Sequence, residues 1–368
     1  MNKVCIVLLS AFFYGCQHVP SPQPANESFL PEYRVMAPIS LYGTYPSETL
    51  QRMCHQAHVN GAACVEDALS GNLFVTTLQQ RGWFENVFPA SSEADYELLI
   101  ASLGTAPSSE DKQTTHPEPL NGIASTRYFT ELTIQWRGVE IDSAIFTSTE
   151  AHNKDKPAIV NDVLEHWWLQ VVAKEVFSAA YLFEKLGASN YLSEMSVPEY
   201  IDNFTRLDTQ LYPDPFKGVI TRYVHPEYDD ALLDVTVAPV LNLNTGSKAV
   251  RLQQALQMNL NEARQMAEAQ SMTLYIDEPV AAFDTPGSDG SVYEGYRMAV
   301  HAILAEAEPI YATTYAFEMK DKLVTISTTF PPRVADRLVA LALPQITVPG
   351  PSPLMESIRR IQAEADNP

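Results

Sequence analysis

Between Tyr128 and Trp136, mostly apolar side chains alternate with mostly polar ones, and this pattern is the feature that most restricts the fold. A period of two residues is typical of a β-strand with one buried and one open face. Arg137 and Gly138 follow as a tight turn, and residues 139–149 return as a second strand. The pattern therefore predicts an antiparallel hairpin. Its inner face carries Tyr128, Thr130, Leu132, Ile134 and Trp136, and its outer face carries Phe129, Glu131, Thr133 and Gln135.

Two helical patterns flank this hairpin. Apolar residues at helical spacing predict a helix over 69–81, closed by Gly82. A longer helix is predicted over 161–187, with Asn161 or Asp162 as its cap. Trp167 and Trp168 fall on the apolar face of that helix. We therefore predict that both pack in the core and do not form an exposed binding platform.

The second half of the chain repeats this mixture of elements. A 22-residue stretch, 249–270, has the apolar spacing of a long helix, and 332–343 predicts a short one. Because strands and helices do not alternate regularly, the fold class expected is α+β, with two domains that each hold a mainly antiparallel sheet and two helices. The strands expected in this half are 218–225, 231–240, 272–283, 291–304, 310–319 and 323–330.

A chain of 368 residues is long for one hydrophobic core, so two domains are expected. Pro198, Pro213 and Pro215 interrupt the regular patterns between the two halves. The predicted organisation is a signal peptide at 1–15, a lipidated tether at 16–31, a first domain at 32–187, a linker at 188–215, a second domain at 216–350 and a C-terminal tail at 351–368.

The N-terminus predicts where the chain resides. Lys3 precedes an apolar run, Val4–Tyr14, which is shorter than the roughly 20 residues that a membrane-spanning helix needs. A secretory signal is therefore the better interpretation. The Gly15-Cys16 junction that follows resembles the lipobox of bacterial lipoproteins.

That resemblance implies that Cys16 is lipidated and becomes the mature N-terminus, and that Gln17 directs the protein to the outer membrane on its periplasmic face. Phe13 and Tyr14 depart from the usual lipobox residues. The alternative is an ordinary signal peptide that is cut elsewhere, with Cys16 removed or left free.

Composition restricts the partners. The formal net charge is −21, which repels nucleic-acid phosphates and anionic lipid headgroups. A nucleic-acid partner is therefore excluded, and the membrane is expected to be reached through the lipid anchor alone. Apolar residues make up 46% of the chain, which is typical of a folded protein.

Cys54 and Cys64 are the cysteines that remain once the signal is removed and Cys16 is modified. An even pair in an oxidising compartment predicts a disulfide. His55 and His58 lie between them, so a zinc site is the alternative, although the C-H-x₂-H-x₅-C spacing matches no standard zinc signature. On the disulfide interpretation both histidines are surface residues.

The motifs of common enzymes are absent. Ser109–Lys112 matches S-x-x-K, but it lies in a polar, proline-flanked segment, and no K-T-G follows. Residues 284–290 lack the ligand spacing of an EF-hand and predict a hairpin loop. We therefore predict no catalytic residue, no metal ligand and no cofactor, and expect a chain that is not an enzyme.

The order of elements in the first half is similar to that of periplasmic accessory lipoproteins, such as the activators of penicillin-binding proteins and the curli-secretion lipoprotein. The residues that carry this resemblance are Leu78, Gly82, Trp83, Phe84, Val87 and Ala94-Asp95-Tyr96. The second half resembles the PsbP-type fold in topology. The expected location, the two α+β modules and the absence of catalytic motifs together predict a non-enzymatic outer-membrane lipoprotein that binds another envelope protein or assists a periplasmic assembly. The alternatives are a periplasmic lipoprotein that binds a small ligand or metal, and an unfamiliar enzyme of the cell wall.

Overall fold

The structure is a computed structural model that describes residues 33–57, 63–105, 126–149, 155–243, 246–287, 290–304 and 308–365. The described chain forms two compact units, 33–182 and 183–365, called here the N-terminal and C-terminal units. The predicted signal peptide, Cys16 with its tether, His58 and the S-x-x-K motif lie outside the described residues.

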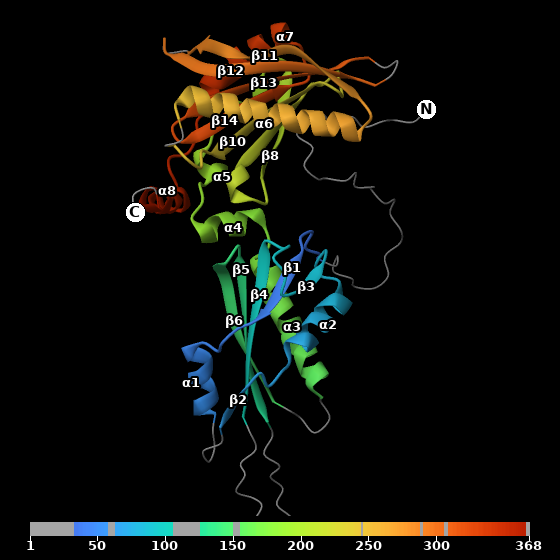
Figure 1. Ribbon diagram of the computed structural model, residues 1–368, viewed down its shortest axis with the longest axis vertical. Helices are drawn as coiled ribbons and strands as arrows, with labels where there is room; N and C mark the ends of the chain where they lie inside the picture. Colours follow the sequence, from blue (N-terminus) through green and yellow to red (C-terminus); the bar gives the residue numbers. More distant parts are fainter. Residues whose placement is uncertain are drawn as a thin grey trace, which may run out of the picture. The chain divides into compact units, whose positions relative to one another are not determined.

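The N-terminal unit is built on a six-stranded sheet (Figure 1). Five strands follow the order β3-β1-β4-β5-β6, and β2 pairs with β4. Strand β1 runs parallel to β3 and β4, and the other pairs are antiparallel. The elements in chain order are β1 (Ile39–Gly43), α1 (Glu48–Gln56), β2 (Cys64–Glu66), α2 (Gly71–Arg81), β3 (Val87–Pro89), β4 (Tyr96–Thr105), β5 (Arg127–Trp136), β6 (Val139–Thr149) and α3 (Lys156–Lys174). Helix α4 (Ala179–Leu186) begins in this unit and ends in the C-terminal unit.

Helices cover both faces of this sheet. Leu50 and Cys54 of α1 pack on Leu103 and Phe129. Because side chains alternate along a strand, Leu132 and Ile134 face the opposite side, where α2 and α3 lie (Figure 1). The second face holds an aromatic cluster, in which the rings of Trp83 and Trp168 stack with centroids 4.5 Å apart. Trp167 is 1% exposed and Trp168 is 8% exposed, which confirms their predicted place in the core.

The long helix predicted over 161–187 is interrupted. Helix α3 ends at Lys174 because Glu175 adopts a left-handed conformation, with φ at 53°. Residues 179–186 then form the separate helix α4. Helix α3 also begins earlier than predicted. Its cap is Asp155, whose Oδ1 accepts a hydrogen bond of 3.1 Å from the amide of Ala158.

The C-terminal unit is built on an eight-stranded antiparallel sheet in the order β11-β12-β13-β14-β10-β9-β8-β7 (Figure 1). Leu256 of α6 packs on Met298 and Ala316 on one face, and Leu338 of α7 packs in the core of Val235 and Ile326 on the other. The elements are α5 (Tyr191–Glu194), β7 (Tyr200–Ile201), β8 (Phe204–Leu211), η2 (Pro215–Lys217), β9 (Val219–Val224), β10 (Leu232–Pro239), α6 (Lys248–Ala269), β11 (Thr273–Pro286), β12 (Val292–Ile303), β13 (Ile310–Met319), β14 (Lys322–Thr328), α7 (Pro332–Ala342), η3 (Leu343–Gln345) and α8 (Pro353–Ala365).

The fold class is α+β with a sheet in each half, as predicted, although the first sheet is mixed because of β1. The segment predicted as a linker, 188–215, has regular secondary structure. This segment contains α5, β7 and β8, and β8 pairs with β9 from Thr205 to Leu211. Its prolines lie outside the paired strands and do not interrupt the ladder.

The predicted C-terminal tail, 351–368, is attached to the C-terminal unit over its described part. Arg359 of α8 donates to Asp321 Oδ2 at 2.9 Å and to the carbonyl of Val240 at 2.7 Å. The buried Lys322 donates to Asp321 Oδ1 at 2.5 Å and to the carbonyl of Gly350 at 3.0 Å. Arg359 and Lys322 thus share the carboxylate of Asp321. Their hydrogen bonds connect the chain after α7 to the β13–β14 turn.

Candidate functional site: an open sheet edge in the N-terminal unit

Sheet edges expose unpaired backbone groups, so natural proteins shorten, bend or charge them. Strands β3 and β7, which have three and two residues, are edges of this short kind. Strand β11 is longer but has register shifts around Glu278 and carries Asp277 and Pro279 at the irregularity. These three edges therefore hold the features that discourage pairing with another chain.

Strand β6 differs along its second half. It lies at the end of its sheet beside β5, and among the described strands it pairs with β5 alone (Figure 1). Its first half carries Glu140 and Asp142, and a register shift occurs there. The second half, 143–149, reads SAIFTST and contains no charged residue, proline or glycine. This seven-residue stretch, called here the open edge, lacks the usual protection.

A groove of about 350 Å³ runs between the open edge and α3. The apolar part of its lining is the half-buried Phe146 with Ile159 and Val163, which are 1% and 2% exposed. Helix α3 also contributes polar side chains to the lining, from Asp162, His166 and Gln170. The full lining comprises Phe146, Thr147, Ser148, Thr149, Ile159, Asp162, Val163, His166 and Gln170.

His166 is oriented by its own helix. Its Nδ1 lies 2.7 Å from the carbonyl oxygen of Asp162, one turn earlier. Because a carbonyl can only accept, Nδ1 carries the proton, and in the neutral ring Nε2 is the acceptor. The groove thus combines free strand backbone, an apolar base and polar side chains on a rigid helix, which is the arrangement used to bind an extended peptide.

The predicted cysteine pair lies in the same unit. Cys54 and Cys64 are at disulfide-bonding distance, with Cα atoms 6.2 Å apart, which fits the predicted disulfide. The bridge joins α1 to β2, and Cys54 is fully buried against the sheet. His55 Nδ1 lies 3.9 Å from Cys64 Sγ.

Within the described ranges, no group of three His, Cys, Asp or Glu side chains is placed to hold a metal ion. The zinc alternative involved His58, which lies outside them. The loop predicted over 284–290 is shorter, because Asp284–Pro286 belong to β11 and pair with β12. The amide of Gly287, which follows β11, donates to the carbonyl of Ser291 at 2.7 Å, and residues 288 and 289 lie outside the described residues.

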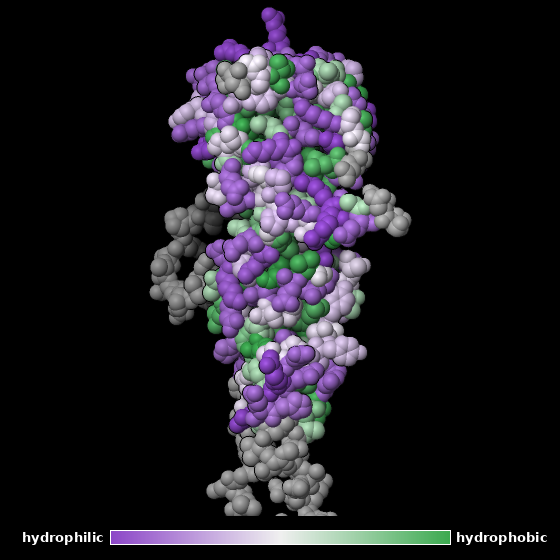
Figure 2. Space-filling view, turned by 90° about the vertical axis from the view of Figure 1, so that its left-hand side faces the viewer, coloured by the Kyte–Doolittle hydropathy of each residue, from purple (hydrophilic) through white to green (hydrophobic). Residues whose placement is uncertain are grey.

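On the face drawn in Figure 2, hydrophilic residues predominate and hydrophobic ones form small separate patches. Scattered apolar side chains are normal on protein surfaces. None of the described helices is both long enough and apolar enough to cross a membrane.

No protein-family profile matches the chain, and no curated protein matches it. Among solved structures, the chain is similar to cyanobacterial PsbP (CyanoP) from Synechocystis sp. PCC 6803, with 14% identity and a TM-score of 0.29. The match covers 42% of this chain and 93% of that one. The likeness is weak, and it is to a protein of the PsbP type expected from the second half. At this TM-score nothing about function follows from it.

Sequence reasoning missed the open edge and its groove. The signal was present, because 143–149 is a strand pattern without charge, which is unusual for an exposed edge. What the sequence did not reveal is that β6 is the last strand of its sheet, since strand order depends on contacts between distant segments.

Proposed function

We propose that this protein is a lipid-anchored accessory module of the bacterial envelope, which binds an extended segment of another envelope protein along the open edge of β6. The observation that carries the proposal is the contrast among the sheet edges. Strands β3, β7 and β11 are short, bent or charged, whereas 143–149 is neutral and has a groove beside it.

The geometry of strand addition agrees with this groove. A bound strand would lie about 4.8 Å from β6 and would form main-chain hydrogen bonds with it. Alternate side chains of that strand would face α3, where Phe146 and Val163 offer apolar contact and His166 offers a polar one. The net charge of −21 favours a basic or neutral segment over an acidic one.

The same proposal includes anchoring at the outer membrane through Cys16, which is inferred from the Gly15-Cys16 junction. Cells that express the Cys16→Ser variant are labelled with palmitate and fractionated. We expect the natural chain to be labelled and membrane-bound, and the variant to be unlabelled and released. A variant that is still labelled would remove the anchor from the proposal.

Photocrosslinking tests the binding edge. A photoreactive phenylalanine analogue replaces Ser148 on the open edge or, as a matched control, the exposed Ala282 on the protected strand β11. We expect an adduct in cells from position 148 and none from position 282. Mass spectrometry then identifies the crosslinked segment of the partner.

A synthetic peptide of that segment completes the test. We expect it to slow amide hydrogen exchange in 143–149. Thr147→Lys should weaken its binding at least tenfold, because an edge lysine opposes strand pairing, whereas Thr147→Val should not. Equal adducts from both positions, or unchanged exchange in 143–149, would contradict the proposal.

A further inference from the structure

The C-terminal unit contains a cavity of about 560 Å³, within the range of small-molecule sites. It lies where the first turn of α6, the beginning of β12, the end of β13 and the segment after α7 meet. The residues that line it are Lys248, Ser291, Val292, Tyr293, Glu294, Phe317, Glu318, Met319, Lys320, Pro344, Ile346, Thr347 and Val348.

The inner part of the cavity is apolar and fixed in shape. Phe317, Ile346 and Val348 are 1%, 2% and 2% exposed. The ring of Phe317 lies directly over Gly295, where any Cβ atom would come within 2.4 Å of it. Glycine at this position therefore allows the ring to occupy the place where it borders the cavity. Val292, Tyr293 and Met319 extend the apolar lining.

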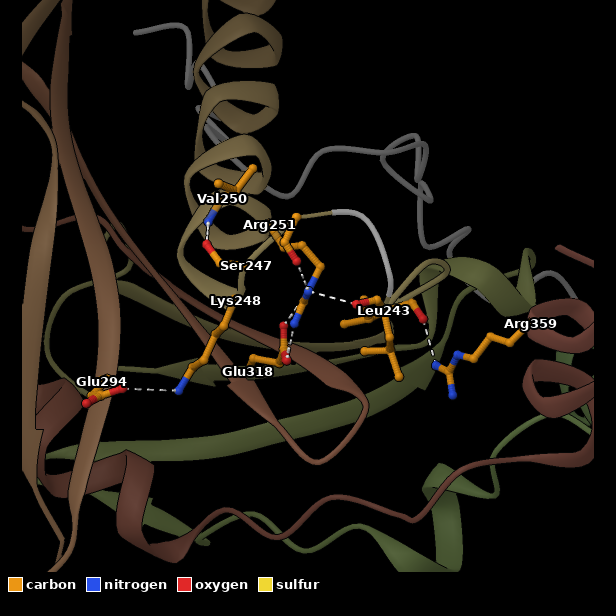
Figure 3. A network of polar contacts seen from close by, with 10 residues as sticks. Leu243, Ser247, Lys248, Val250, Arg251, Glu294, Glu318 and Arg359 are labelled. Carbon is orange, nitrogen blue, oxygen red and sulfur yellow. Dashed lines mark hydrogen bonds and ion pairs between the residues drawn. The ribbon is translucent and has the colours of Figure 1, made fainter. Parts of the chain in front are cut away.

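Charged groups occupy the rim, and Figure 3 shows that one carboxylate there is already paired. Arg251 donates to both oxygens of Glu318, at 2.9 and 2.7 Å, and these side chains are 16% and 11% exposed. The same guanidinium donates to the carbonyls of Leu243 and Gly246 at 3.0 Å. Glu318 is therefore neutralised and held away from other partners.

The other carboxylate at the rim is in solvent. The Glu294 side chain is 75% exposed, and its contact with Lys248 Nζ is 3.9 Å long (Figure 3). An exposed pair at that distance contributes little. The ammonium of Lys248 is therefore available to a ligand.

Two further features make the rim positive. Lys320 Nζ donates to the carbonyl of Val348 at 2.6 Å and retains two more N–H donors. Helix α6 begins at Lys248, so the positive end of a 22-residue helix dipole faces this end of the cavity. The rim therefore has three cations, Lys248, Arg251 and Lys320, and two carboxylates, Glu294 and Glu318. This local excess of positive charge contrasts with the net charge of −21 for the whole chain.

From this arrangement we infer a second binding site, for a small amphiphile with an anionic head group and a single apolar chain. The head lies between Lys248 and Lys320 at the rim. The chain lies along Val292, Phe317 and Met319. This site is separate from the open edge of β6 and does not depend on it, because all its residues belong to the C-terminal unit.

The test uses the full mature chain with ¹³C-methyl-labelled methionine, in which Met319 reports on the cavity and the exposed Met258 is the internal control. Met319→Leu assigns the resonance. Dodecanoate is titrated below its micelle concentration. Acetate supplies the anion without the chain, and dodecyltrimethylammonium supplies the chain with the opposite charge.

We expect dodecanoate to shift the Met319 resonance saturably, without effect on Met258, and both control compounds to leave it in place. Lys248→Gln should raise the Kd for dodecanoate at least tenfold, whereas Lys217→Gln, at an exposed lysine of the same unit, should not change it. An unmoved Met319 resonance, equal binding of dodecyltrimethylammonium, or an unchanged Kd in Lys248→Gln would each overturn the inference.

Discussion

The last long strands of the two sheets, β11 and β6, differ in how well their edges are protected against pairing with another chain. In the C-terminal unit, β11 is bent at Glu278, and Arg297 of β12 pairs with that carboxylate and with Asp336 of α7. In the N-terminal unit, the second half of β6 is neutral and lies beside a groove. The comparison indicates that β11 has features that oppose pairing with another chain, whereas the second half of β6 can pair with an added strand.

The closure of β11 depends on a polar network that the open edge lacks. Arg297 donates to Asp336 at 2.6 Å, and the buried Tyr315 donates to the same carboxylate at 2.5 Å. Burial and the adjacent Asp336 raise the pKa of Tyr315, so its hydroxyl keeps its proton and remains a donor. The network joins the bend in β11 to helix α7 and thereby fixes the strand.

The largest expected effect is at Arg297. Arg297→Met leaves Glu278 and Asp336 without their shared cation and should destabilise the C-terminal unit by about 3 kcal/mol. All four tryptophans lie in the N-terminal unit, so tryptophan fluorescence follows that unit alone, while far-UV circular dichroism follows both. We expect urea unfolding to shift in the dichroism signal and not in fluorescence.

The control for this prediction is Arg337→Met on α7. Arg337 is 73% exposed and pairs with Asp202 at 3.2 Å, so its loss should change stability by less than about 1 kcal/mol. Equal effects of the two substitutions would mean that Arg297 does not hold the β11 edge.

The disulfide gives the next effect in size, and it falls in the other unit. Replacing Cys54 and Cys64 by Ser opens a loop with a sequence separation of 10. On the chain-entropy model this costs about 2.7 kcal/mol. We expect the fluorescence transition to move to lower urea. Alkylation followed by mass spectrometry of protein isolated without a reductant should find no free thiol at either cysteine, and two free thiols would contradict the bridge.

The sequence predicts those elements that local periodicity determines, and it fails for those that depend on burial or on an unusual backbone conformation. The hairpin of 128–149 and the helix closed by Gly82 follow from local periodicity, and both are present. Strand β8 was missed because FTRLDTQL has few apolar residues and, as a strand near the sheet edge, buries few of them. Helix α3 ends where Glu175 adopts a left-handed conformation. The sequence has no glycine or proline at this position to indicate that end.

The candidate sites show the same limit. Cys54 and Cys64 were predictable because their chemistry is carried by residue type. The open edge and the cavity around Phe317 were not, since both depend on strand order and on segments distant in sequence.

The comparison between β11 and β6 is also tested by replacing the residues that protect the edge of β11. The double variant Asp277→Thr and Pro279→Val removes one carboxylate and the proline from the bend of β11 and leaves Glu278 paired with Arg297. A less protected edge should pair more readily with a second copy, so we expect self-association at least tenfold stronger than that of the natural chain, about 1.4 kcal/mol. Sedimentation measures it, and an unchanged monomer would mean that charge and proline do not protect this edge.

The smallest effect concerns the helix beside the open edge. Asp155 caps α3, whereas the sequence suggested Asn161 or Asp162. Asp155→Ala removes the acceptor for the amide of Ala158 and should lower the stability of the N-terminal unit by about 1 kcal/mol. Asp155→Asn retains a capping oxygen and should cost at most a few tenths of that. Fluorescence-detected urea unfolding separates the two. Because α3 forms one wall of the groove, fraying of its first turn should also weaken peptide binding at the end formed by Thr149 and Ile159, and leave the C-terminal unit unchanged. If Asp155→Ala has no effect on stability, Asp155 does not cap α3, and that end of the groove is not fixed as the structure shows.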